Sequence, residues 1–577
     1  MNPTFERALR IGTEVVAGWA DLLDRINVFP VSDGDTGRNL VLTLSPLLRT
    51  GGDRAALIER TLRAARGNSG NIAAQFMSGF LEAEGPNDLS CAVARGRKLA
   101  WKAVPNPRPG TMLSLFDTLS EALQVDGSLS NEDSPDSIIE QLCAAVQATT
   151  DQLPELRKGG VVDSGALGMF LFFDGFLQTL AGKEEGFTSV LDAFEGRLEV
   201  ADSWVGDDPE EGCCIDAVIE ADGQVDNLAS RLRSLGESVV ALQHGHVVKV
   251  HLHASNISEV REKMGTMGKV VSFASDDLEA QQEEFRRTRR KPTIHILTDA
   301  AGSVTREDAA RLGFTLLDSY INIGPDSTPE TRLQPDRLYE ALRSGVAVST
   351  SQASTFERHQ HYGNALSLHG RALYLCVGSA YTGNYETVMA WKRDHDPEDL
   401  LHVLDTGAAS GRLALMALAT AEASLRAQDP MEVIRTATDA ISRSREYVFL
   451  AQLHFLAAGG RLSKTKAFLG DLLNKKPVVS PMPQGAQKVA VLRSRDEQMT
   501  FALARLEAET PTTGPLRILI EYTDNEEWVR SRVGGAVVRL RADATILFRP
   551  FSLTSGAHMG PGTWGLGFLP SINGETP

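Results

Sequence analysis

The sequence has few cysteines, no excess of basic residues and no long uninterrupted apolar run. Its five cysteines lack regular spacing, so they form no disulfide framework and are typical of a reducing compartment. The formal net charge of -17 argues against a nucleic-acid-binding protein, because such a protein needs basic residues to neutralise phosphates. The most apolar stretch, 165–182, is interrupted by Asp174, which favours a buried helix over a transmembrane segment. Residues 1–10 lack a basic segment followed by an apolar run, so we expect no secretory signal and a cytoplasmic protein with at most transient membrane contact.

The chain contains enough apolar sequence for several domains. Hydrophobic residues make up 42% of the chain and charged residues 23%, which is ordinary for a globular protein. A length of 577 residues predicts about three or four domains, because a domain usually has roughly 100–200 residues. We expect domains at 1–195, 196–275 and 293–577, with a charged linker at 276–292.

The hydrophobic pattern changes along the chain and predicts a different fold for each domain. Apolar residues recur at helical spacing over 5–181, which predicts an all-helical domain. Strand-like runs at 215–219 and 247–253 predict a small α/β domain. From residue 293 onward, strand-like runs alternate with helical ones, including a helix at 439–447, which predicts a parallel or mixed sheet covered by helices. The predicted fold class is therefore multidomain, α followed by α/β.

Two aspartates, Asp33 and Asp35, flank Gly34 within the segment N-V-F-P-V-S-D-G-D-T-G-R-N. Close carboxylates on a turn can hold a hard divalent cation such as Mg²⁺ and leave positions for nucleotide phosphates. The five residues D-G-D-T-G are also common in plain turns. The pattern alone therefore leaves both interpretations open.

Two further loops are rich in small residues and precede apolar helices. In R-G-N-S-G-N, 66–71, backbone N–H groups can hold phosphates, and Asn68 and Ser69 add side-chain donors. In G-G-V-V-D-S-G-A-L-G, 159–168, Asp163 lies among glycines at the head of an apolar helix. Asp163 serves there either as part of a site or only as a helix cap.

Together the three loops resemble the DhaL-type nucleotide-binding domain of dihydroxyacetone kinases and, more closely, that of the ATP-binding subunit of bacterial fatty acid kinase. The phrases N-V-F-P-V-S-D-G-D-T-G-R-N, A-R-G-N-S-G and G-V-V-D-S-G carry the resemblance. It implies an antiparallel all-helical barrel with ATP and Mg²⁺ at one end, and Mg²⁺ ligands at Asp33 and Asp35. Dihydroxyacetone kinases have a further metal-binding Asp where this chain has Val28, and Asn27 is the candidate in its place. The residues implied to bind ATP are Thr36, Asn39, Asn68, Ser69, Gly70 and Asp163.

The second predicted domain contains a cysteine and two histidines that can converge. His251 and His253 are two residues apart in V-K-V-H-L-H-A and project from the same face of a strand, where they could bind zinc together with Cys214. A buried cysteine and two ordinary hydrogen-bonded histidines are the alternative. The ATP-binding subunit of fatty acid kinase has a similar small domain with a V-K-V-H-I-H-like strand. That resemblance implies a structural Zn²⁺ at Cys214, His251 and His253.

The last predicted domain contains turns dense in hydroxyl groups, glycines and cations. They are T-D-A-A at 298–301, S-T-S-Q-A-S at 349–354, G-S-A-Y-T-G-N-Y at 378–385, G-G-R-L-S at 459–463 and G-A-H-M-G-P-G at 556–562. Hydroxyl and backbone donors after strands can hold a carboxylate, and Arg461 and His558 can add charge-assisted contacts to a phosphate. Taken singly, each segment is a turn, and Asp299 in the first of them is interpreted as a helix cap or a hinge residue.

As a series, these turns resemble the DegV family, the fatty-acid-binding partners of the same kinase, over 292–577. The resemblance implies a two-lobed α/β domain that binds a fatty acid. Thr350, Ser351 and Ser379 would hold the fatty acid carboxylate. Arg461 and His558 would lie near the phosphoryl group.

The resemblances combine to imply an ATP-dependent phosphotransferase that converts a fatty acid to an acyl phosphate. Catalysis would rest on Asp33, Asp35, Arg461 and His558. Transfer would occur within one chain or across a homodimer, and an acyltransferase of phospholipid metabolism would use the product. Two alternatives stay open, a kinase of a small hydroxyl compound such as dihydroxyacetone and a non-catalytic lipid carrier or sensor.

Overall fold

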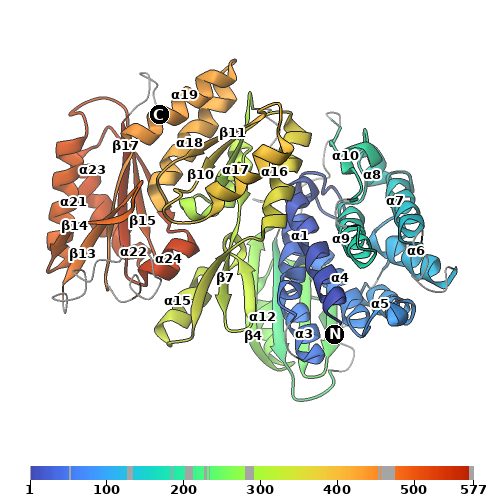
Figure 1. The fold of residues 1–577 in the computed structure, drawn as a ribbon. Coiled ribbons are helices and arrows are strands. Elements are labelled where there is room, and N and C mark those ends of the chain that lie inside the picture. Colours follow the sequence, from blue (N-terminus) through green and yellow to red (C-terminus); the bar gives the residue numbers. More distant parts are fainter. Residues whose placement is uncertain are drawn as a thin grey trace. The chain divides into compact units, whose positions relative to one another are not determined.

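The computed structural model divides the protein into two compact units, Met1–Arg287 and Thr288–Pro577 (Figure 1). The structure describes residues 2–50, 53–104, 106–125, 134–183, 186–201, 204, 212–225, 231–232, 234–279, 292–452, 455 and 475–570. Arg461 with its G-G-R-L-S segment, and most of the expected linker, lie outside the described residues.

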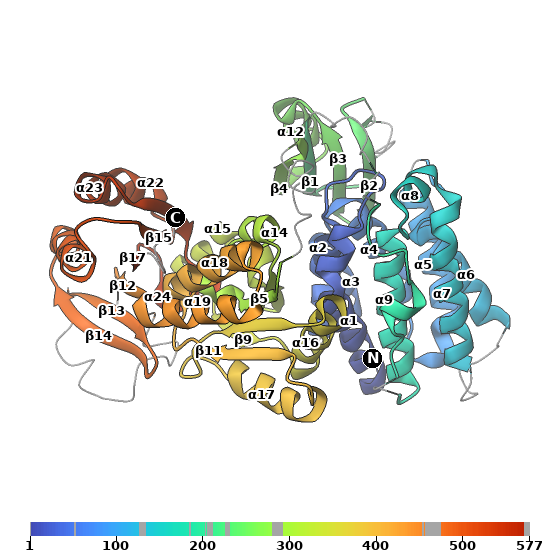
Figure 2. The ribbon, with the colours of Figure 1, turned by 90° about the horizontal axis from the view of Figure 1, so that it is seen from above.

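The first part of the N-terminal unit is helical, as the apolar spacing predicts. Its helices are α1 (Pro3–Arg25), α2 (Thr36–Leu44), η1 (Ser45–Leu48), α3 (Arg54–Ala64), α4 (Gly67–Phe80), η2 (Pro86–Asp88), α5 (Leu89–Ala103), α6 (Met112–Val125), α7 (Ser134–Gln152), α8 (Pro154–Gly159), α9 (Ser164–Leu180) and α10 (Val190–Ala193). The helices α2, α4, α5, α6, α7 and α9 pack each on the next, and α1 packs on both α2 and α9 (Figure 2).

The apolar stretch around Asp174 is the central helix of this packing. Helix α9 is buried from its first residue to Thr179, as expected for a helix that is apolar on all sides. Its Phe173 and Phe176 pack edge-on against Phe80 of α4, with ring centroids 5.9 and 5.2 Å apart. Such edge-to-face pairs add to the area that each ring buries. The prediction of a buried helix is therefore confirmed.

A four-stranded antiparallel sheet follows the helices. Its elements are β1 (Cys213–Glu220), β2 (Glu237–His244), β3 (Val247–Ala254), α12 (Ile257–Gly265) and β4 (Lys269–Asp277), in the strand order β2-β3-β1-β4. One face of β1 and β3 carries Ile215, Ala217, Val248 and Val250 into an apolar core that includes residues of α12. Side chains alternate along a strand, so the opposite face carries the polar residues of both strands. Strands β2 and β3 contact α4.

The C-terminal unit has two larger sheets and a small one. A parallel sheet has the order β11-β10-β5-β6, a mixed sheet has the order β14-β13-β12-β17-β15-β16, and β8-β7-β9 form an antiparallel sheet. Helix α18 contacts β5 and β10 of the first sheet and β12, β15 and β17 of the second. The unit therefore has two α/β lobes that share α18, which confirms the predicted fold class.

The strands of this unit are β5 (His295–Asp299), β6 (Thr315–Leu317), β7 (Ser319–Ile323), β8 (Asp326–Pro329), β9 (Val348–Gln352), β10 (Ala372–Cys376), β11 (Leu401–Asp405), β12 (Arg445–Phe449), β13 (Lys476–Met482), β14 (Gly485–Leu492), β15 (Leu516–Tyr522), β16 (Thr545–Pro550) and β17 (Trp564–Pro570). Its helices are η3 (Ala300–Gly302), α14 (Arg306–Leu312), η4 (Glu330–Arg332), α15 (Pro335–Arg343), α16 (Thr355–His369), α17 (Asn384–His395), α18 (Ser410–Arg426), α19 (Pro430–Arg443), α21 (Arg495–Glu509), α22 (Glu526–Trp528), the π-helix η6 (Val529–Gly534), α23 (Gly535–Leu540) and α24 (Leu553–Met559).

The helix predicted at 439–447 is wrong in its second half. Helix α19 ends at Arg443, and β12 begins at Arg445. Strand β12 pairs with β13 on one side and β17 on the other, and its Val448 and Phe449 are fully buried. The pairing with distant strands decides the conformation here, because a short apolar run fits a helix and a strand equally well.

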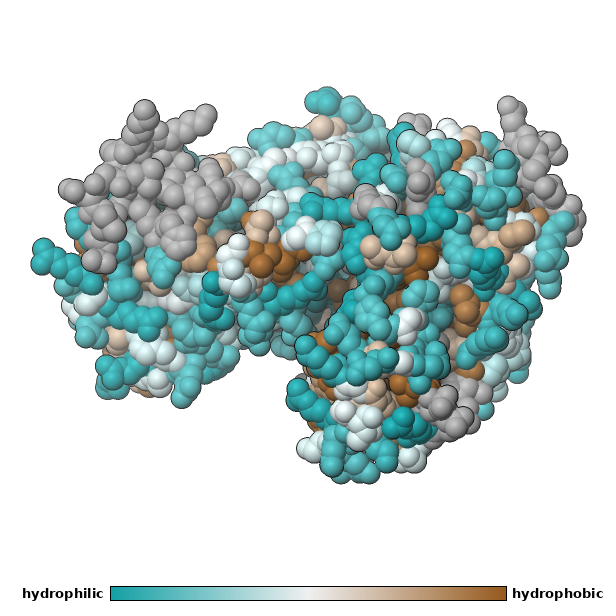
Figure 3. Space-filling view, turned by 90° about the horizontal axis from the view of Figure 1, so that it is seen from below, coloured by the Kyte–Doolittle hydropathy of each residue, from teal (hydrophilic) through white to brown (hydrophobic). Residues whose placement is uncertain are grey.

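The surface of the described residues is mainly polar. Figure 3 shows hydrophilic residues over most of one face, with apolar residues in small groups. The more exposed large apolar side chains include Val346, Met431 and Val538, which lie on separate segments. Within the described residues, no helix combines the length and the apolar character that a membrane crossing requires.

Candidate active site

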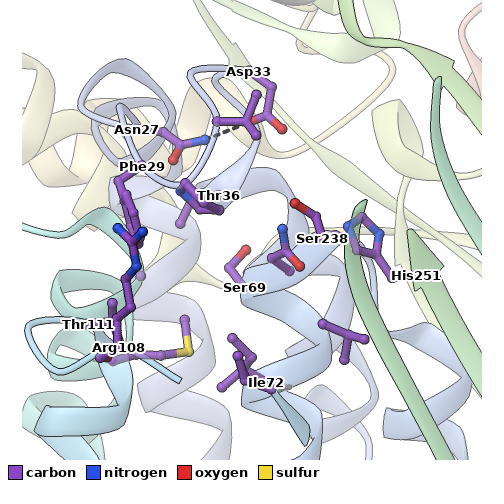
Figure 4. A pocket seen from close by; sticks show the side chains of 18 of the residues that line it. Asn27, Phe29, Asp33, Thr36, Ser69, Ile72, Arg108, Thr111, Ser238 and His251 are labelled. Atoms are coloured by element: carbon purple, nitrogen blue, oxygen red, sulfur yellow. Dashed lines mark hydrogen bonds between the residues drawn. The ribbon is translucent and has the colours of Figure 1, made fainter. Parts of the chain in front are cut away.

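A cavity of about 540 Å³ in the N-terminal unit is the candidate active site (Figure 4). This volume lies within the range of about 300–1,000 Å³ that is usual for small-molecule sites. Its walls come from the loop that precedes α2, from the starts of α2, α4 and α9, and from β2 and β3 of the small sheet. In Figure 4, Phe29 and Arg108 lie on one side, and Ser238 and His251 lie on the other.

Three helices begin at this cavity. Thr36 begins α2, Gly67 begins α4 and Ser164 begins α9, and all three residues line the cavity. The first N–H groups of a helix have no partner within the helix and carry a partial positive charge. Asn68 and Ser69, in the first turn of α4, also line the cavity. This arrangement suits a polyanion such as a chain of phosphates.

Asp33 and Asp35 face the same cavity from the loop before α2. Asn27 Nδ2 donates a hydrogen bond to Asp33 Oδ1 at 2.7 Å, and Arg38 Nη2 lies 3.5 Å from Asp35 Oδ2. Loss of hydration and the nearby charge of Asp35 raise the pKa of Asp33 well above its usual range. A cation bound by both carboxylates would remove this repulsion, and their oxygen atoms are the ligands that Mg²⁺ prefers. The donor set therefore fits Mg²⁺, with Asn27 beside it.

Two residues expected to contact ATP lie behind the cavity wall. Asn39 and Gly70 do not line the cavity. Gly67 has a φ of +57°, and a Cβ there would lie 2.0 Å from Asn39 Nδ2, so Asn39 packs against the backbone at the start of α4. A Cβ on Gly70 would lie 2.3 Å from Thr43 Oγ1 of α2. The glycine at position 70 therefore permits the close packing of α4 on α2.

Asp163 both caps α9 and lines the cavity. Its Oδ1 accepts a hydrogen bond from Ala166 N at 2.7 Å, and burial raises the pKa of Asp163 to about 7. The neighbouring Ser164 hydroxyl donates to Thr36 Oγ1 at 3.1 Å. Asp163 is therefore both a helix cap and a residue of the cavity wall. The hydrogen bond between Ser164 and Thr36 joins the starts of α9 and α2.

Cys214, His251 and His253 meet on the polar face of the small sheet. One potential ligand atom from each lies within 4.8 Å of the others, and all three residues are buried. Strand pairing sets Cys214 opposite His253. His251 Nε2 is buried without a hydrogen-bond partner, and burial raises the pKa of the Cys214 thiol well above its usual range. One thiolate and two imidazoles are a donor set that fits Zn²⁺.

Sequence reasoning missed two charged residues beside this cluster, Asp216 and Lys249. Lys249 Nζ lies 3.2 Å from Asp216 Oδ1, and His251 Nδ1 lies 3.5 Å from Asp216 Oδ2. Burial alone would raise the pKa of Asp216, but Lys249 and His251 hold it well below the usual range. Burial lowers the pKa of Lys249 to about 8. Residues two apart on a strand lie on the same face, so the pattern that placed His251 and His253 together also places Lys249 with them on β3. By the same rule, Asp216 lies on the same face of β1 as Cys214.

In the C-terminal unit, the structure brings two of the predicted substrate-binding residues together. Thr350 Oγ1 of β9 lies 3.0 Å from His558 Nε2 of α24. Ser351 Oγ accepts a hydrogen bond from Asn322 Nδ2 at 3.3 Å. Ser379 Oγ, after β10, donates to Asp405 Oδ2 at 2.6 Å. Thr350 and His558 are therefore in contact, whereas Ser351 and Ser379 form hydrogen bonds with Asn322 and Asp405 instead.

Glu330 is a buried acid that supports the helix carrying His558, and we expect Glu330→Gln to be more stable than the unaltered chain at pH 7. Glu330 Oε2 accepts a hydrogen bond from Thr554 N at 2.9 Å in the first turn of α24, and burial raises the pKa of Glu330 to about 8. Below pH 4.5, the ordinary pKa of a glutamate, Glu330 is protonated in both the folded and the unfolded state. Between that value and pH 8, only the unfolded state releases the proton, so the stability of the folded state falls as pH rises.

Glutamine keeps the hydrogen-bond acceptor and cannot ionise. Glu330→Gln should therefore raise the free energy of unfolding by ~3 kcal/mol at pH 7 and leave it almost unchanged at pH 4. Urea denaturation at both pH values, followed by circular dichroism, measures the difference. Glu340→Gln, at an exposed position on α15, is the matched control and should change stability at neither pH. An equal gain at pH 4 and pH 7 would show that ionisation of Glu330 is not the cause.

Three family models match successive parts of the chain. The DAK2 domain matches residues 30–178, and the FakA-like middle domain of fatty acid kinase matches residues 210–285. The DegV family of uncharacterised proteins matches residues 293–571. These matches confirm the DhaL-type, small-domain and DegV resemblances noted in the sequence.

The chain is also similar to curated and structurally known proteins. Protein YloV of Bacillus subtilis is 27% identical over 317 residues, which cover 50% of this chain and 57% of YloV. An uncharacterized protein of Staphylococcus aureus strain bovine RF122 is 28% identical over 357 residues, 56% of this chain and 64% of that protein. The chain thus spans little more than half of the curated relatives it matches.

Two solved DegV proteins are similar to about half of the chain. A fatty-acid-binding DegV family protein from Thermus thermophilus is 23% identical, with a TM-score of 0.44 over 48% of this chain and 99% of that one. DegV of Bacillus subtilis, described as a fatty acid binding protein, is 19% identical, with a TM-score of 0.45 over 48% of this chain and 100% of that one.

Proposed function

We propose that this chain, which joins a DAK2 domain, a FakA-like middle domain and a DegV-family domain, is an ATP-dependent phosphotransferase that makes an acyl phosphate from a fatty acid. The observation that carries the proposal is the cavity where α2, α4 and α9 begin beside Asp33 and Asp35. Helix N-termini stabilise phosphates, and paired carboxylates suit the cation that accompanies ATP.

The remainder of the cavity suits the base of a nucleotide. Phe29, Val31, Ile72 and Met112 give it an apolar wall. The Arg108 guanidinium lies 5.6 Å from the centroid of the Phe29 ring. A flat apolar surface next to a phosphate site matches the two chemical parts of ATP, since the base stacks and the phosphates accept hydrogen bonds. Arg108 also pairs with Glu155 Oε1 at 3.2 Å, which keeps it at the rim.

In the proposed reaction, the γ-phosphoryl group of ATP passes to a carboxylate. An oxygen of the fatty acid carboxylate bonds to the γ-phosphorus, the bond from that phosphorus to the bridging oxygen breaks, and ADP leaves with the electron pair. A carboxylate is already ionised at neutral pH, so the reaction needs no general base. The protein therefore acts by positioning and by offsetting charge.

Several polar residues of the cavity have roles in this scheme. Asp33 and Asp35 would hold Mg²⁺, which neutralises charge on the phosphates when bound. The N–H groups of Asn68 and Ser69, with the Thr36 hydroxyl, would hold the phosphates. Asp163 keeps the start of α9 in place through its bond to Ala166 N.

The C-terminal unit would supply the fatty acid. The hydroxyl of Thr350 and the imidazole of His558 lie together, and both can donate hydrogen bonds to a carboxylate. The proposal includes transfer within one chain and transfer between two chains.

The test of the proposed function is ADP formation by the purified, delipidated chain with Mg-ATP. We expect an added fatty acid to raise the rate at least ~10-fold, because positioning of the acceptor supplies most of the acceleration. Hydroxylamine should trap the product as an acyl hydroxamate, which mass spectrometry detects. Thr350→Val, which removes a hydroxyl at almost constant shape, should raise the fatty acid concentration needed for half-maximal rate and leave the affinity for ATP unchanged.

Two other results would reject the proposal. ADP formation that responds to dihydroxyacetone or glycerol and not to fatty acids would identify a kinase of small hydroxyl compounds. Lipid that co-purifies with a chain unable to consume ATP would identify a carrier or sensor.

A further inference from the structure

One carboxylate of the small sheet contacts the start of α4, Gly67–Asn71, which is the proposed phosphate-binding segment. Asp216 lies on β1, and its Oδ2 accepts a hydrogen bond from Gly67 N at 3.0 Å. Its Oδ1 lies 3.3 Å from Asn71 Nδ2, which also donates to Gly67 O at 2.7 Å. Asp216 therefore holds both backbone polar groups of Gly67, the N–H directly and the carbonyl through Asn71.

The same carboxylate contacts the strand that carries the two histidines. Lys249 Nζ and His251 Nδ1, both on β3, lie 3.2 and 3.5 Å from its two oxygens. Asp216 is 5% exposed and Lys249 is 2% exposed, so water screens these contacts little. A buried carboxylate is costly unless it is paired and hydrogen-bonded, and Asp216 has four such contacts. Its position is therefore closely defined by both elements.

Asp216 does not itself line the cavity. It occupies the place of a helix cap for α4, where it accepts from the N–H of Gly67, while the next two residues, Asn68 and Ser69, line the cavity. Arg66, at the N-cap position of α4, makes no side-chain cap hydrogen bond. Gly67 also has the left-handed φ of +57°, a conformation that an external hydrogen bond helps to hold.

We propose that Asp216 is a positioning residue for phosphate binding, through which the small sheet holds the start of α4, Gly67–Asn71, in its nucleotide-binding conformation. This inference rests on the proposed function, since it assigns this segment to the phosphates of ATP. Asp216 acts through Gly67 and Asn71 and touches neither the nucleotide nor the reacting atoms.

The test is the dissociation constant for Mg-ADP, measured by isothermal titration calorimetry on the full chain. Asp216→Asn keeps the shape of the side chain but brings an NH₂ group toward donors. We expect the dissociation constant to rise about tenfold, which corresponds to ~1.4 kcal/mol. The zinc content of Asp216→Asn should equal that of the unaltered chain, whereas its unfolding temperature should fall, because asparagine leaves the buried Lys249 ammonium without its counter-charge. A merely structural role would lower the unfolding temperature and leave the affinity unchanged.

Glu220→Gln is the matched control. Glu220 lies on the same strand, and its Oε1 accepts a hydrogen bond from Arg63 Nη2 of α3 at 3.2 Å, so it also joins the sheet to the helices. Among the described residues, Glu220 has no hydrogen bond or ion pair with Gly67–Asn71, and its replacement should leave Mg-ADP affinity unchanged. If Asp216→Asn fails to fold, Asn71→Ala weakens the same link, and we expect about a threefold rise in the dissociation constant.

Three results would overturn the inference. An unchanged affinity in Asp216→Asn would show that the start of α4 keeps its conformation without Asp216. Loss of zinc together with affinity would assign Asp216 to the metal site instead. If the unaltered chain did not bind Mg-ADP, both the proposed function and this inference would be rejected. If Asp216→Asn bound Mg-ADP as tightly as the unaltered chain, only this inference would be rejected.

Discussion

Replacement of Asp35 by asparagine is expected to lower fatty-acid-dependent ADP formation about a thousandfold, equivalent to ~4 kcal/mol of activation free energy. Asp35 is 6% exposed and lies immediately before α2, with Asp33 beside it in the cavity wall. The amide keeps the shape but removes the charge that would hold Mg²⁺ against the phosphates. Fewer ligands and a lower negative charge weaken binding of a hard cation.

The measurement is the steady-state rate at saturating Mg-ATP, with circular dichroism to confirm folding. Asp33→Asn should cause a loss of similar size if the two carboxylates share one cation. Asp53→Asn, an exposed residue before α3 in the same unit, is the control and should retain the full rate. Full activity of Asp35→Asn would reject the assigned site.

Asp299→Ala should destabilise the C-terminal unit by about 4 kcal/mol, because it leaves a buried guanidinium without its counter-charge. Asp299 is fully buried and accepts four hydrogen bonds, each of 2.8 Å, from Arg358 Nη1, Tyr374 OH, Val377 N and Asn384 Nδ2. Burial alone would lower the pKa of Arg358, but the charge of Asp299 raises it. Asp299 therefore joins β5, β10, α16 and α17, and its side chain makes no cap hydrogen bond, which corrects the interpretation as a helix cap.

Differential scanning calorimetry should show a fall of roughly 10 °C in the unfolding temperature of this unit. The double variant Asp299→Ala/Arg358→Met should recover part of the loss, since no charge is then buried alone. Asp326→Ala breaks an exposed ion pair with Arg337 and should shift the transition by no more than about 2 °C. An effect of Asp299→Ala as small as that of Asp326→Ala would contradict the role given to the buried network.

Some of the site could be predicted from sequence because the relevant patterns are local. Asp33 lies in the loop before α2, Thr36, Asn68 and Ser69 lie in the first turns of α2 and α4, and all four line one cavity. Loop chemistry of this kind depends on near neighbours in the chain. The position of Asn39 behind the wall could not be seen in the same way, because it follows from how closely α4 approaches α2.

Contacts between residues far apart in sequence were decided by the fold. Asp216 meets Gly67 only because the small sheet packs against the start of α4, and Thr350 meets His558 only because α24 packs beside β9. No periodicity within one segment reports such a contact. Strand β12 is a further case, since its partners β13 and β17 come later in the chain.

The sequence by itself determined the order of a helical region and two α/β regions, and the residue types that line the candidate sites. Helical and strand periodicities and short loop motifs depend on neighbours in the chain, so they can be read before folding. Only the tertiary structure decided which polar side chains support the start of α4 and which form the buried network around Asp299. Those roles depend on burial and on pairing across elements, because a charged group changes its effect on stability when distant segments remove it from water.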